Sequence, residues 1–264
     1  MTEFDAKQYW ETRLAANPGL RGVGFVRLGR QYNDWLYRVR RQVFRRRMRA
    51  LDTPVDGLDV LDIGSGTGFY LDRWRELGVG SVVGTDLAEV AVQALRRSHP
   101  GSEVHQVDIG GDLGPLSGRT FDIVSAFDVL FHIVEDERFE AAVKHIRSLL
   151  EPGGLFVWSD NFVHQQTVRI PHQSSRSLDF IERTLASSGF EVVERRPMFV
   201  LMNGPADTRG PLLKGWWLGL RGLVSLGEPL GWTVGALLYP LELLLTRILR
   251  ESPSTELMIC RAVD

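Results

Sequence analysis

Between positions 58 and 200, short runs of hydrophobic residues alternate with stretches in which apolar residues recur at helical spacing. The apolar runs predict strands at 59–63, 81–85, 103–107, 121–127, 154–160 and 190–194. The stretches between them predict helices at 70–77, 89–97, 137–150 and 177–187. Strands separated by helices of this length predict a doubly wound α/β fold, with a mostly parallel sheet covered on both faces.

Three segments flank this 58–200 core. Residues 1–50 have helical spacing and many aromatic residues, 203–250 are rich in Gly, Leu and Trp, and 255–262 form an isolated last strand. We expect one domain over 1–264, with N-terminal helices and a helical insertion before the closing strand. The longest uncharged run of the insertion, 229–241, is shorter than the roughly 18–20 residues that cross a bilayer, so it does not predict a transmembrane helix.

Charge is unevenly distributed along the chain. The formal net charge of −2 gives no general argument for nucleic-acid binding. Yet residues 1–50 carry twelve Lys or Arg against four Asp or Glu, mostly within 38–49. This Arg-rich stretch fits either an amphipathic helix with a solvated basic face or a site for an anionic group. The lone Cys260 and the polar, acidic N-terminus lead us to expect a cytoplasmic protein without disulfides.

A glycine-rich loop follows the first predicted strand. The sequence runs from Asp62 through Gly64, Ser65, Gly66 and Gly68 into the next helix. Glycines here permit unusual backbone angles and let a ligand approach the main chain. The G-x-G-x-G spacing differs from the G-x-G-x-x-G of dinucleotide folds. An acid two residues before the loop suits a ligand with ammonium and sulfonium groups better than a pyrophosphate.

Two more acids end the next strands. Asp86 follows the second strand, 22 residues after Gly64, about where an α/β nucleoside-binding fold places the carboxylate that contacts the ribose. Asp108 ends the third strand. The carboxyl ends of the strands are where open α/β sheets bind ligands, so we expect these acids to meet at one site.

These stretches resemble the class I (Rossmann-like) S-adenosylmethionine-dependent methyltransferases. The resemblance extends to the segments 121–133 and 149–155 and covers about 58–200 plus the closing strand. It implies the sheet order 3-2-1-4-5-7-6 with an antiparallel last strand. It also implies S-adenosyl-L-methionine as cofactor and methyl transfer as the reaction.

The resemblance also implies roles for individual residues. The glycine loop would wrap the methionine end of the cofactor, with Asp62 serving its amino group, directly or through water, and Asp86 holding its ribose. Leu87 and Ile109 would flank the adenine, and Asp108 would accept from the adenine amino group. Phe127 would border the sulfonium, as would Asp128 unless it caps the following helix. Tyr9 and Trp10 would be aromatic residues of an N-terminal lid over 1–50, or plain packing residues.

His132 is the candidate catalytic residue, because it follows the fourth strand, where the transferred methyl should lie. It could act as a general base or only line the pocket, and a base is required only if the acceptor must lose a proton. His164 and His172 are weaker alternatives. No His, Cys, Asp or Glu residues show metal-ligand spacing, so we expect no metal.

The acceptor should contact the aromatic and apolar segments 1–50 and 203–250. We expect a small hydrophobic or amphiphilic molecule rather than a nucleic acid. The insertion could roof the acceptor pocket, form a homodimer contact or dock on a membrane surface, and its position in the chain favours the roof. The rival functions are a non-catalytic binding protein with this fold and, with less support, an NAD(P)-dependent oxidoreductase.

Overall fold

Seven strands form the central sheet of the computed structural model, which describes residues 4–17, 19–208 and 210–263. They are β1 (Asp59–Ile63), β2 (Ser81–Asp86), β3 (Glu103–Gln106), β4 (Phe121–Phe127), β5 (Leu150–Asp160), β8 (Phe190–Pro197) and β9 (Glu256–Ala262). The order is β3-β2-β1-β4-β5-β9-β8. Strands β1 to β5 pair in parallel, and β9 runs antiparallel between β5 and β8. The predicted sheet order and antiparallel closing strand are confirmed.

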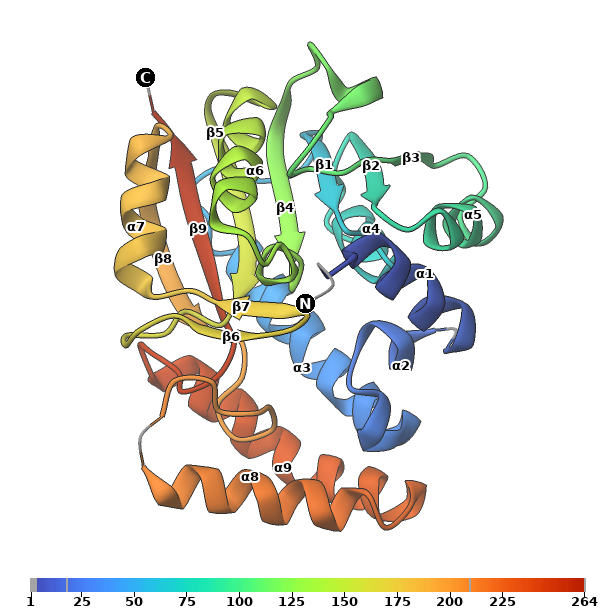
Figure 1. Ribbon diagram of the computed structural model, residues 1–264, viewed down its shortest axis with the longest axis vertical. Coiled ribbons are helices and arrows are strands. Elements are labelled where there is room, and N and C mark those ends of the chain that lie inside the picture. Colours follow the sequence, from blue (N-terminus) through green and yellow to red (C-terminus); the bar gives the residue numbers. More distant parts are fainter. Residues whose placement is uncertain (1–3, 18, 209, 264) are drawn as a thin grey trace.

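Helices cover both faces of this sheet (Figure 1). Those that connect strands are α4 (Phe69–Arg75), α5 (Glu89–Ser98), α6 (Asp136–Ser148) and α7 (Leu178–Ser187). The N-terminal helices are α1 (Ala6–Ala16), α2 (Leu20–Val23) and α3 (Gly29–Met48). Helices α8 (Pro211–Val224) and α9 (Glu228–Ile248) lie between β8 and β9, and the 3-10 turns are η1 (Val26–Leu28), η2 (Gly114–Leu116) and η3 (Leu130–His132). No helix in the described ranges is long and apolar enough to cross a membrane.

A small hairpin of β6 (Val168–Ile170) and β7 (Gln173–Ser175) was not predicted. All three residues of β6 are exposed, so this strand has no alternation of buried and exposed positions. The hairpin carries His172 in its turn and places it beside η3, where His132 lies.

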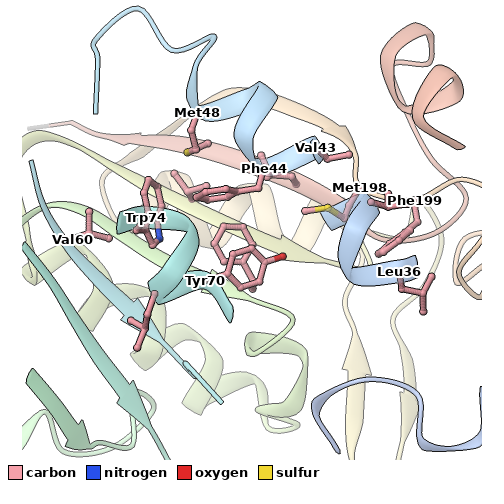
Figure 2. Close-up of a cluster of buried hydrophobic side chains, with 14 of the residues drawn as sticks. Leu36, Val43, Phe44, Met48, Val60, Tyr70, Trp74, Met198 and Phe199 are labelled. Carbon is pink, nitrogen blue, oxygen red and sulfur yellow. The ribbon is translucent and has the colours of Figure 1, made fainter. Parts of the chain in front are cut away.

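Helix α3 supplies one of the two hydrophobic cores of the protein. Its apolar side chains pack against β1 and α4 on one side and against Met198 and Phe199 on the other (Figure 2). The members on α3 are Leu36, Val39, Val43, Phe44 and Met48, all buried. The amphipathic helix predicted for the Arg-rich stretch is therefore confirmed.

The second core lies on the opposite face of the sheet, under α6 and α7. Helix α7 begins at Ser177, whose side chain accepts from the backbone N–H of Phe180, and Gly189 follows its end at φ +79°. These are the capping residues expected at the two ends of a helix, and they fix where α7 stops and β8 begins.

Helix α9 packs along α3 at close range. A Cβ on Gly235 would lie 2.3 Å from Cδ1 of Trp35, so only glycine permits this approach. Trp35 also contacts the rings of Trp232 and Tyr239 at centroid distances of 6.0 and 5.2 Å. The insertion thus covers the outer side of α3, with α3 between it and the sheet (Figure 1).

Candidate active site at the carboxyl ends of the strands

A cavity opens where β1, β2, β3 and β4 end, and it is closed from above by α1 and α3. Many predicted cofactor residues line it, namely Trp10, Gly64, Ser65, Gly66, Asp86, Leu87, Asp108, Ile109 and Phe127. The candidate catalytic residue His132 also lines it. The structure therefore brings together most of the residues that the sequence singled out.

The glycine loop forms the floor of the cavity through its first two glycines. Gly64 and Gly66 have φ of +68° and +54°, backbone angles that other residues adopt at a cost. A Cβ on Gly64 would lie 2.3 Å from Cγ2 of Val129, and one on Gly66 would lie 2.9 Å from Cγ1 of Val23. Both glycines are needed to fit the loop between β4 and the N-terminal segment.

Gly68 lies at the start of α4, outside the lining of the cavity. A Cβ there would lie 2.4 Å from Cε1 of His99. At φ +81° it is the residue from which α4 starts. Gly68 therefore serves the packing of α4 against α5.

Asp62 is enclosed within the protein. It is 2% exposed and does not line the cavity. Its carboxylate accepts a 2.7 Å hydrogen bond from the hydroxyl of Ser125, which in turn accepts from the indole N–H of Trp74 at 3.0 Å. Burial raises the pKa of Asp62 to about 7. Asp62 lies behind the loop and joins β1 to β4 and α4, so direct contact with the cofactor amino group is not what the geometry shows.

Asp86 occupies the position expected of it. Its Oδ2 accepts from the N–H of Gly66 and its Oδ1 from the N–H of Ala88, both at 2.9 Å. Burial raises the pKa of Asp86, and these hydrogen bonds oppose the rise. The carboxylate faces the cavity and also fixes the glycine loop to the end of β2.

Asp108 lies at the rim of the cavity beyond Asp86. Its Oδ2 is 2.5 Å from Nη2 of Arg138, and its Oδ1 accepts from the N–H of Gly110 at 3.1 Å. The sequence analysis did not identify Arg138. With Leu87 and Ile109 beside it, Asp108 defines the end of the cavity nearest β2 and β3.

The opposite end of the cavity contains an ion pair between Asp128 and Arg40. Asp128 follows β4 in the left-handed region, with φ +58°, and its Oδ1 accepts from Ser159 at 2.9 Å. The alternative of a helix cap is wrong, because this carboxylate pairs with Arg40 of α3 instead. The pair outweighs the burial that disfavours the charged guanidinium, so the pKa of Arg40 is raised.

Arg40 and Tyr70 bring unsatisfied polar atoms to this end of the cavity. Both residues are 9% exposed and line it. The guanidinium of Arg40 and the hydroxyl of Tyr70 lie close enough to interact, but among the described residues Nε of Arg40 and this hydroxyl have no hydrogen bond of good geometry. The Tyr70 ring stacks on Phe127 at a centroid distance of 3.7 Å. Buried polar groups are normally paired, so these atoms fit a site that pairs with a bound molecule.

Arg40 was not predicted as a site residue, although its position in the sequence carries a signal. Arg40 comes four residues after Leu36 and three before Val43, which places it on the apolar face of α3. An arginine on the buried face of a helix needs a partner in the interior, unlike the arginines on the solvated face.

His132 meets the N-terminal helix at the mouth of the cavity. Its Nδ1 lies 2.7 Å from the carbonyl oxygen of His172, so Nδ1 carries the proton and Nε2 keeps its lone pair. The indole of Trp10 contacts the imidazole edge-on at a centroid distance of 4.8 Å. Burial lowers the pKa of His132 to about 3, so the ring is neutral at physiological pH and a weak base.

The other two candidate histidines lie away from the lining. His164 pairs with Asp207 at 2.5 Å, and His172 stacks on Tyr9 at a centroid distance of 5.3 Å. Tyr9 itself does not line the cavity, and its hydroxyl accepts from Nη1 of Arg13 at 2.7 Å. Of the two lid aromatics, Trp10 alone reaches the cavity, and Tyr9 is a packing residue of α1.

Helix α1 is held over the cavity by the carboxylate of Glu11. This carboxylate accepts from the N–H groups of Glu89 and Val90, at 2.6 and 3.1 Å, and so caps α5 from outside. Arg13 donates to the carbonyl oxygens of Gly22 and Gly24, at 2.8 and 2.5 Å. These contacts hold the N-terminal segment in place over the cavity.

The prediction that the segment 211–249 roofs the acceptor pocket is wrong. No residue of α8 or α9 is among those that line the cavity. The physical reason is α3, whose buried face already closes the cavity and whose other side accepts α9.

Comparisons with known proteins agree with this geometry. Residues 60–154 match the family model described as "Methyltransferase domain". A tRNA U34 carboxymethyltransferase of Pseudoalteromonas translucida is 33% identical over 141 residues, which cover 50% of this chain and 42% of that protein. A ubiquinone biosynthesis O-methyltransferase of Rhizobium etli is 30% identical over 165 residues, covering 55% and 65% of the two chains. The chain thus spans less than two thirds of these relatives' length.

Solved structures share the fold. The DhpI–SAH complex structure is 18% identical and covers 98% of this chain and 96% of that one, with a TM-score of 0.57. Together, the sheet order and these neighbours show that the chain has the fold of the class I S-adenosylmethionine-dependent methyltransferases, and residues 60–154 carry the match to a methyltransferase domain. The cofactor of this class is S-adenosyl-L-methionine.

Proposed function

We propose that this chain transfers the methyl group of S-adenosyl-L-methionine to a small hydrophobic or amphiphilic acceptor. The observation that carries the proposal is the cavity itself, with Asp86 buried at the end of β2 and hydrogen-bonded to the glycine loop. The cavity extends along the ends of the strands from β3 to β4, and its N–H groups, carboxylates and apolar walls lie along this line. An elongated nucleoside ligand requires such an arrangement.

The residues present fit the cofactor. Asp86 would accept from the ribose hydroxyls, Leu87 and Ile109 would flank the adenine, and Asp108 would accept from its amino group. Gly64 and Gly66 would leave room for the methionine portion. The unpartnered atoms of Arg40 and Tyr70 would pair with a polar group of the cofactor or acceptor at the far end.

The cofactor supplies an activated methyl group on a sulfonium. The chain's part is to align the acceptor with that methyl and to exclude water. Trp10, Tyr37 and Phe69 provide aromatic walls for this, beneath the lid that Glu11 fastens. We propose that His132 acts there as a neutral lining residue whose Nε2 can accept a hydrogen bond from the acceptor, because burial makes it a weak base.

A nucleic-acid acceptor is the second candidate, since one relative is a tRNA U34 carboxymethyltransferase. The mouth of the cavity favours the small molecule. It carries the acids Asp5, Asp108 and Glu135 against the cations Lys7 and Arg138. A surface that binds the phosphate backbone of RNA is instead strongly basic.

Turnover assays test this assignment. The chain is incubated with S-adenosylmethionine and either amphiphilic phenols, amines and carboxylic acids or total tRNA, and released S-adenosylhomocysteine is measured. We expect turnover with members of the small-molecule panel and none with tRNA. Turnover with tRNA alone would replace the small-molecule assignment, and cofactor binding without any turnover would favour the non-catalytic alternative.

A further inference from the structure

The α8–α9 hairpin leaves an unusual amount of apolar surface uncovered. Across the described residues, twelve of the seventeen large hydrophobic side chains that are exposed lie between positions 212 and 249. Contiguous exposed apolar surface on this scale marks an interaction site or a membrane-binding face. Figure 1 shows the two helices along the lower edge of the molecule, outside α3.

On α9, five of the six exposed large apolar side chains form one stripe, and the sixth, Trp232, lies against Trp35 of α3. Their spacing of seven, four, three and four residues places them on the same side of the helix. They are Leu230, Leu237, Leu241, Leu244 and Ile248, with exposures from 39% to 73%. The opposite side of α9 is buried through Gly231, Gly235 and Thr246. Helix α8 adds Leu212, Trp216 and Leu223 to the apolar surface.

Both acids of this hairpin accept hydrogen bonds from backbone N–H groups elsewhere in the protein. Glu228 accepts from the N–H groups of Arg30 and Gln31, at 2.9 and 2.7 Å, and so caps α3. Glu242 is buried and accepts from the N–H groups of Val200, Leu201 and Met202. Glu242 is thereby removed from the surface, whereas Glu228, exposed at the start of α9, leaves one negative charge there.

The cations of the hairpin, in contrast, are not engaged in ion pairs with any of the described residues. Lys214, Arg221 and Arg247 have no acidic partner among the residues that the structure describes. At the end of α9, Arg45, Arg49 and Arg247 line a surface hollow next to Leu243. Burial, and then the like charges of Arg47 and Arg247, lower the pKa of Arg46 beside it to about 10. Positive charge therefore accumulates at the end of α9, where it meets α3.

We propose that the α8–α9 face docks the protein onto the surface of an anionic lipid bilayer. The apolar stripe enters the headgroup region, and the cations of the hollow contact lipid phosphates, the arrangement of helices that lie in a membrane interface. A second copy of this chain fits less well, because the same unmatched cations would lie close together across a symmetric contact. The inference does not depend on the proposed activity.

Vesicle co-flotation of the full chain tests the proposal. Vesicles of phosphatidylcholine alone are compared with vesicles that also contain phosphatidylglycerol. We expect binding to the anionic vesicles, weakened by salt and by Leu237→Asp/Leu244→Asp. Arg49→Glu/Arg247→Glu should weaken it about tenfold or more, because each cation contributes on the order of 1 kcal/mol at an anionic surface.

Matched variants on other faces provide the controls. Val168→Asp/Ile170→Asp changes two exposed apolar residues of β6, and Arg97→Glu/Arg183→Glu reverses two exposed cations on α5 and α7. Both should bind vesicles like the wild type, and S-adenosylhomocysteine binding should be equal in all variants. Absence of binding to anionic vesicles, or equal losses in the controls, would overturn the proposal. So would a dimer in light scattering that Leu237→Asp/Leu244→Asp converts to a monomer without any vesicle binding.

Discussion

At the scale of single residues, the two buried carboxyls of Asp62 and Asp86 have different surroundings. Asp86 lines the cavity, whereas Asp62 is enclosed behind the glycine loop. Asp86→Ala should weaken S-adenosylhomocysteine binding by ~1.5–3 kcal/mol, the usual cost of removing a charged hydrogen-bond partner. Calorimetric titration measures this, with Asp62→Asn as the comparison variant and a smaller expected loss. Equal losses would show that Asp86 acts only through the loop.

Asp62 should also make stability depend on pH. An unfolded aspartate loses its proton near its ordinary pKa of about 3.9, whereas folded Asp62 keeps its proton up to about pH 7. The folded state therefore binds more protons between these values, and its stability falls as pH rises through them. Asp62→Asn removes this loss and keeps an oxygen that can accept from Ser125.

Denaturant unfolding of both proteins measures the difference. The stability of Asp62→Asn relative to the wild type should increase from about pH 4 to pH 7, by an amount on the order of 2–4 kcal/mol, and then level off. Asp160, whose pKa burial raises to about 8, is present in both chains and cancels in the comparison. A relative stability that stays constant with pH would contradict the protonated, buried state of Asp62.

His132→Ala tests whether the imidazole contributes more than contact. As a neutral lining residue, its loss should lower turnover by less than about tenfold, short of the roughly 10²–10⁴ typical of a general base. Because burial keeps the ring neutral, the loss should be the same at every pH of the assay. A fall within the general-base range, with cofactor affinity intact, would restore His132 as the base.

At the scale of elements, the fastening of α1 to α5 should control cofactor affinity. Helix α1 has no buried residue, so the Glu11 carboxylate is a main attachment. Glu11→Ala should weaken S-adenosylhomocysteine binding about three- to tenfold, since such a cap contributes ~1 kcal/mol. Thermal unfolding should change by less than about 4 °C. Glu137→Ala, in the first turn of α6, is the matched control, and an equal effect there would argue against a lid.

Elements differ in how well the sequence predicted them. The alternation of strands and helices predicted the strands of the sheet, because each element carries its own periodicity. The order of the strands and the antiparallel direction of β9 were implied by the family resemblance. The β6–β7 hairpin was not predicted, because its residues lack such a periodic pattern. The position of α9 against α3 was not predicted either. Helical spacing predicts which side of a helix is buried, but not that Gly235 admits Trp35 of α3.

The same limit applies to the site. Strand-end acids could be predicted because topology alone brings strand ends together, as it does for Asp86 and Asp108. The Arg40–Asp128 pair joins residues that are far apart in the sequence and could not be matched without the fold. Whether Asp62 contacts the cofactor directly or through water could not be predicted, because its place in the motif does not show on which side of the loop its side chain lies.

At the scale of the whole molecule, the cavity and the apolar α8–α9 face lie in separate regions. The cavity lies under α1 and α3 at the carboxyl ends of the strands, and the α8–α9 face lies outside α3 (Figure 1). Changes on the α8–α9 face should therefore leave cofactor binding intact, and changes in the cavity should leave vesicle binding intact.

The central claim is that the cavity binds S-adenosylmethionine. Isothermal titration of the chain with S-adenosylhomocysteine tests it most directly, with NADPH as the competing ligand and Asp86→Ala as the variant. The account predicts one site per chain for S-adenosylhomocysteine, weaker binding in the variant and no binding of NADPH. Binding of NADPH without binding of S-adenosylhomocysteine would contradict it.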